Sequence, residues 1–328
     1  MKDLSSSRPT PSGTRDVLPD EMTELRQMTR AMLDLVLADG YGEVRTPTLE
    51  YERTTASTLG PKPAYRLIDE HGDGLVLRSD MTVPIARIAS SRFADAEGPL
   101  RFSYLAPTWR RVKAHRAEAT EVLQFGVELV GAAEQDPAVE ILSLLGRVLE
   151  AAGLKDWRIS VGHAGISKEL LDLLSLDEET TTACLGALQA GNLVRLRELL
   201  PSQSVELLGV SAQEALTLRQ PAASVPESYA ADGTPAISSL LDLIGNLPSD
   251  VQARTIVDFS LRPEMDYYGG IVFEVYDPAI GRALGSGGRY DSLFDISRPG
   301  TVAIGFGLDV ERVHEAVAGE ERGEGLTT

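Results

Sequence analysis

The order of strand-like and helix-like segments is the feature of this sequence that most limits its fold. Strand candidates at 65–69, 74–78, 100–109 and 121–130 are followed by a helix candidate at 138–152, so strands and helices do not alternate regularly. A doubly wound parallel sheet needs regular alternation, because each parallel strand returns through a helix. The sequence therefore predicts an α+β fold, with an antiparallel sheet flanked by helices.

The remaining segments extend this pattern in both directions. Leu25, Met28 and Met32 recur at helical spacing and predict a helix from 19 to 39, which Gly40 ends. Further strands are predicted at 157–163, 255–261, 271–276 and 301–307, and a last helix from 309 to about 317.

The stretch from about 170 to 250 differs in texture from the rest. It is rich in Leu and Ala, with helical runs at 185–200 and 212–218 that prolines separate. It reads as a small helical insertion within a core of residues 11–318. The polar residues 1–10 are expected to be disordered, and residues 319–328 to form a flexible acidic tail.

Composition excludes several classes of protein. The net charge of -18 opposes loose binding of nucleic acid. A single cysteine, Cys184, allows neither an internal disulfide nor a cysteine zinc cluster, and the four histidines lie far apart. Neither a secretion signal nor a run of about 18 apolar residues is present. We expect a cytoplasmic protein without a metal, another cofactor or a membrane partner.

Short motifs in a fixed order run along nearly the whole chain. They are Pro11-Ser12-Gly13-Thr14-Arg15-Asp16, Gly40-Tyr41 with Thr46-Pro47, Leu77-Arg78-Ser79-Asp80-Met81-Thr82, Trp109-Arg110, Gln124-Phe125-Gly126-Val127-Glu128, Asp266-Tyr267-Tyr268, Gly287-Gly288-Arg289-Tyr290-Asp291, and Gly305-Phe306 with Glu311-Arg312. Together they resemble the class II aminoacyl-tRNA synthetases and, in detail, the histidyl-tRNA synthetases. The resemblance spans about 11–313, and so many motifs in the right order make it specific.

The chain departs from the synthetase pattern at the positions that handle ATP. Trp109-Arg110 with 124–128 resembles motif 2 of these enzymes, and Gly305-Phe306 with Glu311-Arg312 resembles motif 3. The departures are Val112, Ala117 and Glu118 in motif 2, Pro263 with Arg262 one step out of register, and Asp309 in motif 3. Glu118 stands where the family has an arginine, and a carboxylate repels phosphate. Asp309 replaces a glycine that lies close to adenine, so its side chain and charge should obstruct that site. The resemblance also ends where an anticodon-binding domain would begin.

Damaged ATP motifs beside intact histidine motifs resemble the paralogous family of ATP phosphoribosyltransferase regulatory subunits. This resemblance implies a non-catalytic subunit that partners the short-form catalytic subunit and binds L-histidine for feedback inhibition of the first step of histidine biosynthesis. It also implies a homodimer within a hetero-octamer and no tRNA partner.

The resemblance also implies a histidine-binding site and assigns its parts. The site residues are Asp80, Thr82, Arg110, Gln124, Glu128, Tyr267 and Tyr268. Asp80, Thr82 and Gln124 suit the ammonium group, and Arg110 suits the carboxylate. Glu128 and Tyr268 would hold the two imidazole nitrogens, with Tyr267 as a wall. No residue is assigned a catalytic role.

Several alternatives remain open at this point. Asp80 could cap the helix that begins near Met81, and the two tyrosines could be ordinary core residues. For the whole chain, a truncated histidyl-tRNA synthetase-like enzyme that activates histidine with ATP is the main alternative. A tRNA-binding module without catalysis is the third.

Overall fold

The computed structural model describes residues 10–55, 64–111, 119–131, 136–200, 206–207, 210–211, 218–225, 234–262, 265, 267–295 and 297–324. The predicted disorder of the first ten residues therefore lies almost wholly outside the described residues, as does most of the helical run expected at 212–218.

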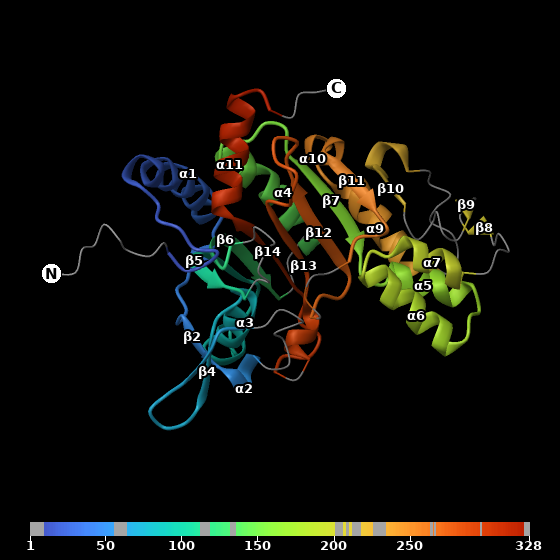
Figure 1. The fold of residues 1–328 in the computed structure, drawn as a ribbon, viewed down its shortest axis with the longest axis horizontal. Helices are drawn as coiled ribbons and strands as arrows, with labels where there is room; N and C mark the ends of the chain where they lie inside the picture. Colours follow the sequence, from blue (N-terminus) through green and yellow to red (C-terminus); the bar gives the residue numbers. More distant parts are fainter. Residues whose placement is uncertain are drawn as a thin grey trace.

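A nine-stranded sheet forms the centre of the molecule (Figure 1). Its order is β1 (Gly42–Glu43), β5 (Leu100–Trp109), β6 (Glu121–Val130), β14 (Ala303–Asp309), β13 (Gly285–Arg289), β12 (Ile271–Tyr276), β7 (Arg158–His163), β11 (Thr255–Asp258) and β10 (Arg219–Pro221). The strands predicted at 100–109 and 121–130 are confirmed residue for residue as β5 and β6.

The sheet is mixed, which corrects the expectation of an antiparallel one. β1 pairs with β5 in parallel, and β11 pairs with β7 in parallel. The six remaining strand pairs are antiparallel. In both parallel pairs helices lie between the two strands along the chain, so the chain can return in the same direction.

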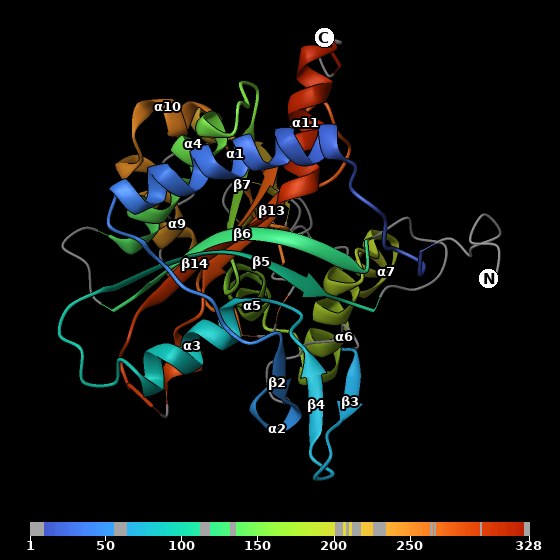
Figure 2. The same cartoon turned by 90° about the vertical axis from the view of Figure 1, so that its left-hand side faces the viewer.

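Three helices cover one face of the sheet. α1 (Pro19–Ala38), α4 (Pro137–Ala151) and α11 (Val310–Glu321) lie together on this face, as Figure 2 shows. α1 buries Leu25, Met28, Met32 and Val36, which share one helical face and belong to the main hydrophobic core. The predicted α+β class is thus confirmed, with helices packed on a sheet.

The opposite face carries smaller elements. They are α3 (Thr82–Ser91), the 3-10 helix η4 (Asp291–Phe294), α2 (Glu52–Thr55), and a three-stranded sheet in the order β2 (Leu49–Tyr51), β4 (Gly74–Leu77), β3 (Arg66–Ile68). A second hydrophobic cluster lies here, and Met81, Ile85, Tyr104, Tyr290 and Phe294 are among its buried members. The functional side chains described below lie in this layer.

The segment expected as a helical insertion contains both helices and strands. Its elements are α5 (Ile166–Leu173), α6 (Glu178–Gln189), α7 (Leu193–Leu199), β8 (Glu206–Leu207), β9 (Val210–Ser211), β10, the 3-10 helix η2 (Ala222–Ser224), α9 (Pro235–Asn246) and α10 (Ser249–Ala253). β10 extends the main sheet by pairing with β11. The segment is therefore not purely helical, and its last strand belongs to the central sheet.

The last helix is longer than the sequence indicates. α11 continues to Glu321, and Gly319 is buried within it. The start of the expected tail at 319 is therefore helical, while residues 325–328 lie outside the described residues.

Candidate functional site

Alternation along β6 and β14 separates the side chains of the core from those of the site. Val127 and Phe306 point toward the helices and are fully or almost fully buried in the main core. Glu128 and its register partner Gly305 point to the opposite face, as do Gln124 and Gly307. One face of these strands therefore offers polar side chains over a floor of glycines.

The glycines leave the space that the polar side chains occupy. A Cβ atom on Gly305 would lie 1.9 Å from Oε2 of Glu128. A Cβ atom on Gly307 would lie 1.9 Å from Nε2 of Gln124. Both positions on β14 therefore exclude any larger residue while Glu128 and Gln124 keep these positions.

Glu128 is the most buried charged residue of the site, with 1 % of its surface exposed. The Thr82 hydroxyl donates to its Oε1 at 2.8 Å, and the Tyr290 hydroxyl donates to its Oε2 at 2.5 Å. Burial raises the pKa of Glu128 to about 8, and the two hydroxyl hydrogen bonds offset only part of the effect.

Aromatic rings enclose the Glu128 carboxyl group. The centroid of the Tyr267 ring lies 4.9 Å from that of Tyr268 and 6.3 Å from that of Tyr290. Tyr104 is buried on the neighbouring strand β5. Burial, followed by the charge of Glu128, raises the pKa of Tyr268, so its hydroxyl keeps its proton at neutral pH.

Asp80 lies at the N-terminus of α3. Its Oδ1 accepts a hydrogen bond from the backbone N–H of Val83 at 3.0 Å, so it caps the helix as the alternative interpretation proposed. It is also only 6 % exposed, and its pKa is raised by burial, an effect that the nearby Arg110 charge partly offsets. Capping uses one oxygen, and the carboxylate has further acceptor capacity.

Arg110 lies beside Asp80, at the end of β5. Its Nε donates to the backbone carbonyl of Ser79 at 2.9 Å. Its positive charge also lowers the pKa of Asp80, Tyr104 and Tyr268 relative to burial alone. It is therefore a cation held at the edge of the tyrosine-lined site.

Gln124 supplies an acceptor that the protein itself does not use. Its Oε1 is buried and has no hydrogen-bond partner within the part of the chain that the structure describes. A buried acceptor without a donor costs free energy, about 1–3 kcal/mol. A ligand that brings an N–H group to this point would remove the cost.

The structure brings all seven residues named from the sequence into one region. The Thr82 hydroxyl donates a hydrogen bond to Glu128. The charges of Glu128, Asp80 and Arg110 all affect the pKa of Tyr268, so these groups lie near its hydroxyl. Sequence reasoning missed Tyr290 and Tyr104. Tyr290 stands in the quoted motif Gly287-Gly288-Arg289-Tyr290-Asp291, so its position in that motif was the available signal. For Tyr104 the only signal in the sequence was its place among the alternating side chains of the strand β5.

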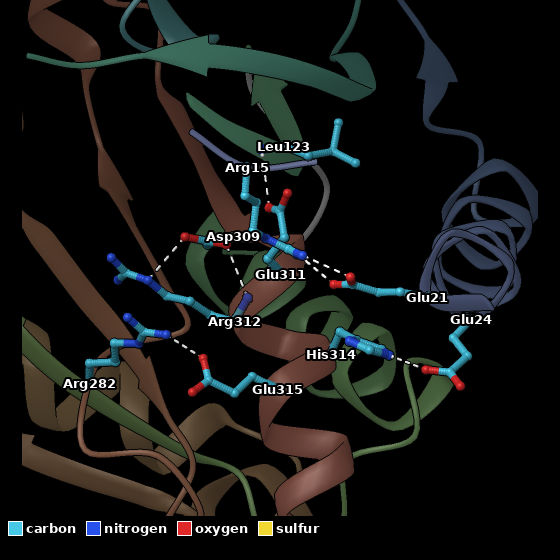
Figure 3. A network of polar contacts seen from close by, with 10 residues as sticks. All are labelled: Arg15, Glu21, Glu24, Leu123, Arg282, Asp309, Glu311, Arg312, His314 and Glu315. Atoms are coloured by element: carbon cyan, nitrogen blue, oxygen red, sulfur yellow. Dashed lines mark hydrogen bonds and ion pairs between the residues drawn. The ribbon is translucent and has the colours of Figure 1, made fainter. Parts of the chain in front are cut away.

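A network of ion pairs lies beyond Gln124, where β14 leads into α11 (Figure 3). Oδ1 of Asp309 accepts from the backbone N–H of Arg312 at 3.1 Å, and its Oδ2 pairs with Nε of Arg312 at 3.0 Å. Nη1 of Arg312 donates to the Ala283 carbonyl at 2.8 Å. Asp309 thus caps α11 and forms an ion pair with the guanidinium group of Arg312, the arginine of motif 3.

Neighbouring arginines in this network are engaged in the same way. Arg15 pairs with Glu21 at 2.5 Å, and Arg282 pairs with Glu315. Glu311 accepts from the backbone N–H of Leu123 at 3.3 Å. Acidic side chains of the chain itself therefore pair with three arginines around the start of α11, and one of these arginines is Arg312 of motif 3.

The other departures from the synthetase pattern lie mostly outside the described residues. They are Val112, Ala117, Glu118 and Pro263, together with the motif residue Asp266. Arg262 is described, and its Nη1 donates to the carbonyls of Phe259 and Leu261 at 2.9 and 3.0 Å.

The described residues show neither a candidate metal site nor a candidate membrane span. Within those ranges no group of three or more His, Cys, Asp or Glu side chains is arranged to hold a metal ion. Over the same ranges, no helix combines the length and apolar character that crossing a membrane requires.

Comparison with known proteins places this chain in a family. The family model described as histidyl-tRNA synthetase matches residues 13–313. A protein of Shouchella clausii named ATP phosphoribosyltransferase regulatory subunit is 38 % identical over 324 residues, 94 % of this chain and 80 % of that protein. The protein of the same name from Geobacillus thermodenitrificans is 36 % identical, over 96 % of this chain and 82 % of the relative.

Solved structures agree with the sequence comparison. The structure of an ATP phosphoribosyltransferase regulatory subunit/histidyl-tRNA synthetase from Bacillus halodurans matches with a TM-score of 0.83 and 31 % identity, over 95 % of this chain and 83 % of that one. Apo histidyl-tRNA synthetase of S. aureus matches with a TM-score of 0.63 at 21 % identity, over 98 % and 75 % of the two chains, which shows the shared fold alone. The chain belongs to the family of ATP phosphoribosyltransferase regulatory subunits, on the class II core that this family shares with histidyl-tRNA synthetases.

Proposed function

We propose that this chain is a histidine-sensing regulatory subunit of ATP phosphoribosyltransferase. It is required for the activity of the short-form catalytic subunit, and it binds L-histidine to inhibit the first step of histidine biosynthesis. The names of its relatives support the regulatory role. The buried Glu128, with its two hydroxyl donors and its wall of tyrosines, is the observation that supports histidine as the ligand.

The site offers a separate partner for each part of histidine. An imidazole has one nitrogen at each side, and Glu128 and Tyr268 are two polar groups that can meet them. A ligand without the second nitrogen would leave one of these buried groups unpaired, which gives strong discrimination. The ammonium group suits Asp80, Thr82 and the unpartnered Oε1 of Gln124.

The carboxylate of histidine is assigned to Arg110. Arg110 is a cation at the edge of the site, and a guanidinium can bind a carboxylate through two parallel hydrogen bonds. Tyr267 is assigned to the wall of the pocket, where its ring packs on that of Tyr268.

The subunit makes no product of its own in this proposal. The support is the ion pair between Asp309 and Arg312, in which a carboxylate of the chain itself engages the guanidinium group of the motif 3 arginine. A triphosphate would have to displace this ion pair and would meet the Asp309 charge. The proposed assembly is a homodimer within a cytoplasmic hetero-octamer of four regulatory and four catalytic subunits, without tRNA.

Feedback inhibition requires that histidine bind the two states of the complex with different affinities. The test uses the reconstituted complex and measures phosphoribosyl-ATP formation against histidine concentration. Tyr268→Phe removes the hydroxyl proposed to meet the imidazole and should weaken inhibition at least tenfold while the complex still assembles, because a buried partner is lost. Tyr276→Phe at the far end of β12 is the matched control and should be inhibited like wild type. Unchanged inhibition of Tyr268→Phe would contradict the proposed site.

The alternative enzyme is tested on the purified chain alone. We expect no histidine-dependent exchange between ATP and pyrophosphate, because Arg312 is engaged by Asp309. Robust exchange would establish the synthetase chemistry and replace the regulatory proposal.

A further inference from the structure

We propose that Tyr290 is a positioning residue that sets the specificity of the pocket. Its hydroxyl, together with that of Thr82, holds the Glu128 carboxyl group in one orientation, in which it accepts a hydrogen bond from only one of the two ring nitrogens of the ligand. The proposal rests on the proposed histidine site. It adds a residue that acts on the ligand through Glu128.

The two hydroxyls select one orientation of a flexible side chain. A glutamate can adopt several rotamers, and the last bond before its carboxyl group turns easily. At Glu128 the Thr82 hydroxyl donates to Oε1 at 2.8 Å, and the Tyr290 hydroxyl donates to Oε2 at 2.5 Å. Because each oxygen has its own donor, both the place of the carboxyl group and the rotation of its plane are fixed. Each oxygen keeps acceptor capacity for a ligand.

Glu128 depends on these hydroxyls more than other glutamates of the core depend on single donors. Glu50 and Glu140 are each paired with an arginine. Within the described ranges no arginine or lysine forms an ion pair with Glu128, and its side-chain hydrogen bonds come from Thr82 and Tyr290. Removing one hydroxyl therefore leaves the carboxyl group with one anchor and free to turn about it.

Tyr290 is itself held in place, as a positioning residue must be. Its backbone N–H donates to the Ala303 carbonyl at 2.8 Å, and the Ala303 N–H donates to Oδ1 of the next residue, Asp291, at 2.9 Å. Its buried ring lies edge-on to that of Tyr267, with the centroids 6.3 Å apart, and 6.4 Å from that of Phe294. Burial raises the pKa of its hydroxyl, which therefore stays a donor at neutral pH.

A fixed acceptor distinguishes between rings that differ by one atom. A ring that places an N–H group at Glu128 satisfies the acceptor. A ring with a C–H group there leaves a buried acceptor unpaired, which should lower the affinity at least ~tenfold. A carboxyl group that can turn would follow either ring, so the discrimination requires Tyr290 and Thr82.

The experiment measures the binding of L-histidine and of two analogues to the full chain by calorimetry. In both analogues a pyrrole ring replaces imidazole. One isomer keeps only the ring N–H next to the bond to Cβ, and the other keeps only the remote N–H. For wild type we expect the isomer whose N–H meets Glu128 to bind at least ~tenfold more tightly than the other. For Tyr290→Phe this ratio should fall to within about threefold.

The ratio separates positioning from a structural role. General loosening of the pocket would weaken both isomers alike and leave their ratio unchanged. Tyr41→Phe is the matched control, because it removes a hydroxyl that donates to Glu140 at 2.8 Å on the opposite face of the sheet. It should keep the wild-type ratio.

A second pair of variants tests the other anchor and covers the case in which Tyr290→Phe does not fold. Thr82→Val removes the hydroxyl and should narrow the ratio, whereas Thr82→Ser keeps the hydroxyl and should retain more of it. The two analogues carry the same ammonium group, so any contact of Thr82 with that group cancels in the ratio.

Equal affinities of wild type for the two isomers would overturn the proposal. A wild-type ratio in a folded Tyr290→Phe protein, or in Thr82→Val, would overturn it as well. Failure of the proposed function looks different, because wild type would then bind no L-histidine.

Discussion

Glu128 illustrates how much of this site depends on the neighbours of single residues. In the sequence it is one of 49 acidic residues, and its apolar neighbours Val127 and Leu129 along the chain do not show which groups its carboxyl group meets. In the fold it lies above Gly305 and receives two hydroxyl hydrogen bonds from distant parts of the chain. Its properties, including its raised pKa, therefore come from tertiary contacts.

The raised pKa of Glu128 should make the stability of the protein depend on pH. The folded state keeps the proton up to about pH 8, whereas the unfolded chain releases it near ~4.3. Between these values the unfolded state binds fewer protons, so the free energy of unfolding falls as the pH rises. Urea unfolding from pH 5 to 8.5 should show this decline in wild type and a smaller decline in Glu128→Gln. Equal pH slopes for the two proteins would show that Glu128 ionises freely.

Gly305→Ala should damage the site and the fold together. Its Cβ would lie 1.9 Å from Oε2 of Glu128 and 2.4 Å from the Val127 carbonyl, so the strands must separate. We expect the free energy of unfolding to fall by at least ~2 kcal/mol and histidine binding to be lost. Gly186→Ala is the matched control, since a Cβ there meets nothing within 4 Å in helix α6. It should be neutral or stabilising by about 0.5–1 kcal/mol in the same denaturant titration.

At the scale of elements, one carboxylate joins three parts of the helix-covered face. Glu140 of α4 accepts from Arg101 of β5 at 2.8 and 3.0 Å, and from the Tyr41 hydroxyl at 2.8 Å. Tyr41 follows α1 and is buried. These contacts fix α1 and α4 against the edge of the sheet that contains β5, next to the site strands.

Removing Glu140 should loosen this junction. Burial opposes its ionisation, but the hydrogen bonds from Arg101 and Tyr41 outweigh burial and lower its pKa. We expect Glu140→Ala to reduce the free energy of unfolding by about 1.5–3 kcal/mol at pH 7. Because the folded pKa is depressed, the difference should shrink as the pH falls through that value and the carboxylate of the wild type becomes protonated. Thermal unfolding at pH 7 and pH 3 measures both quantities, and a difference that grew in acid would contradict this assignment.

Element boundaries show where reading the sequence was sufficient and where it was not. β5 and β6 were predicted residue for residue, because each is a long strand rich in apolar residues and bounded by clear breaks. The insertion was expected to be helical, yet it contains β10, which pairs with β11. A three-residue edge strand has too few residues for a period to be seen, and its partner decides that it is a strand.

At the scale of the whole molecule, the sheet divides two environments. The face under α1, α4 and α11 buries the main core, while α3 and η4 lie on the other face (Figures 1 and 2). That second face carries the smaller hydrophobic cluster together with the polar side chains of Glu128 and Gln124 over Gly305 and Gly307. A ligand that binds only the folded pocket stabilises the whole chain by mass action. L-Histidine at 100 times its Kd should therefore add about 2.7 kcal/mol, which for a chain of this size is a rise in Tm of about 4 °C.

This prediction is checked by thermal unfolding of the isolated chain with and without ligand. Leucine at the same concentration is the control and should leave Tm unchanged, because it lacks ring nitrogens for Glu128 and Tyr268. Equal shifts with both amino acids would mean that the pocket does not recognise the imidazole.

The sequence by itself determined the class of fold, the family and the seven residues proposed for the site. Those inferences depend on local periodicity and on motifs, which are written in residues close together along the chain. Only the tertiary structure decided that the sheet is mixed, that Asp309 forms an ion pair with Arg312, and that Tyr290 donates a hydrogen bond to Glu128. The direction of a strand depends on the path by which the chain returns to the sheet. Burial, pKa shifts and long-range hydrogen bonds depend on residues that are far apart in the sequence, such as Glu128 and Tyr290, and that meet only in the folded chain.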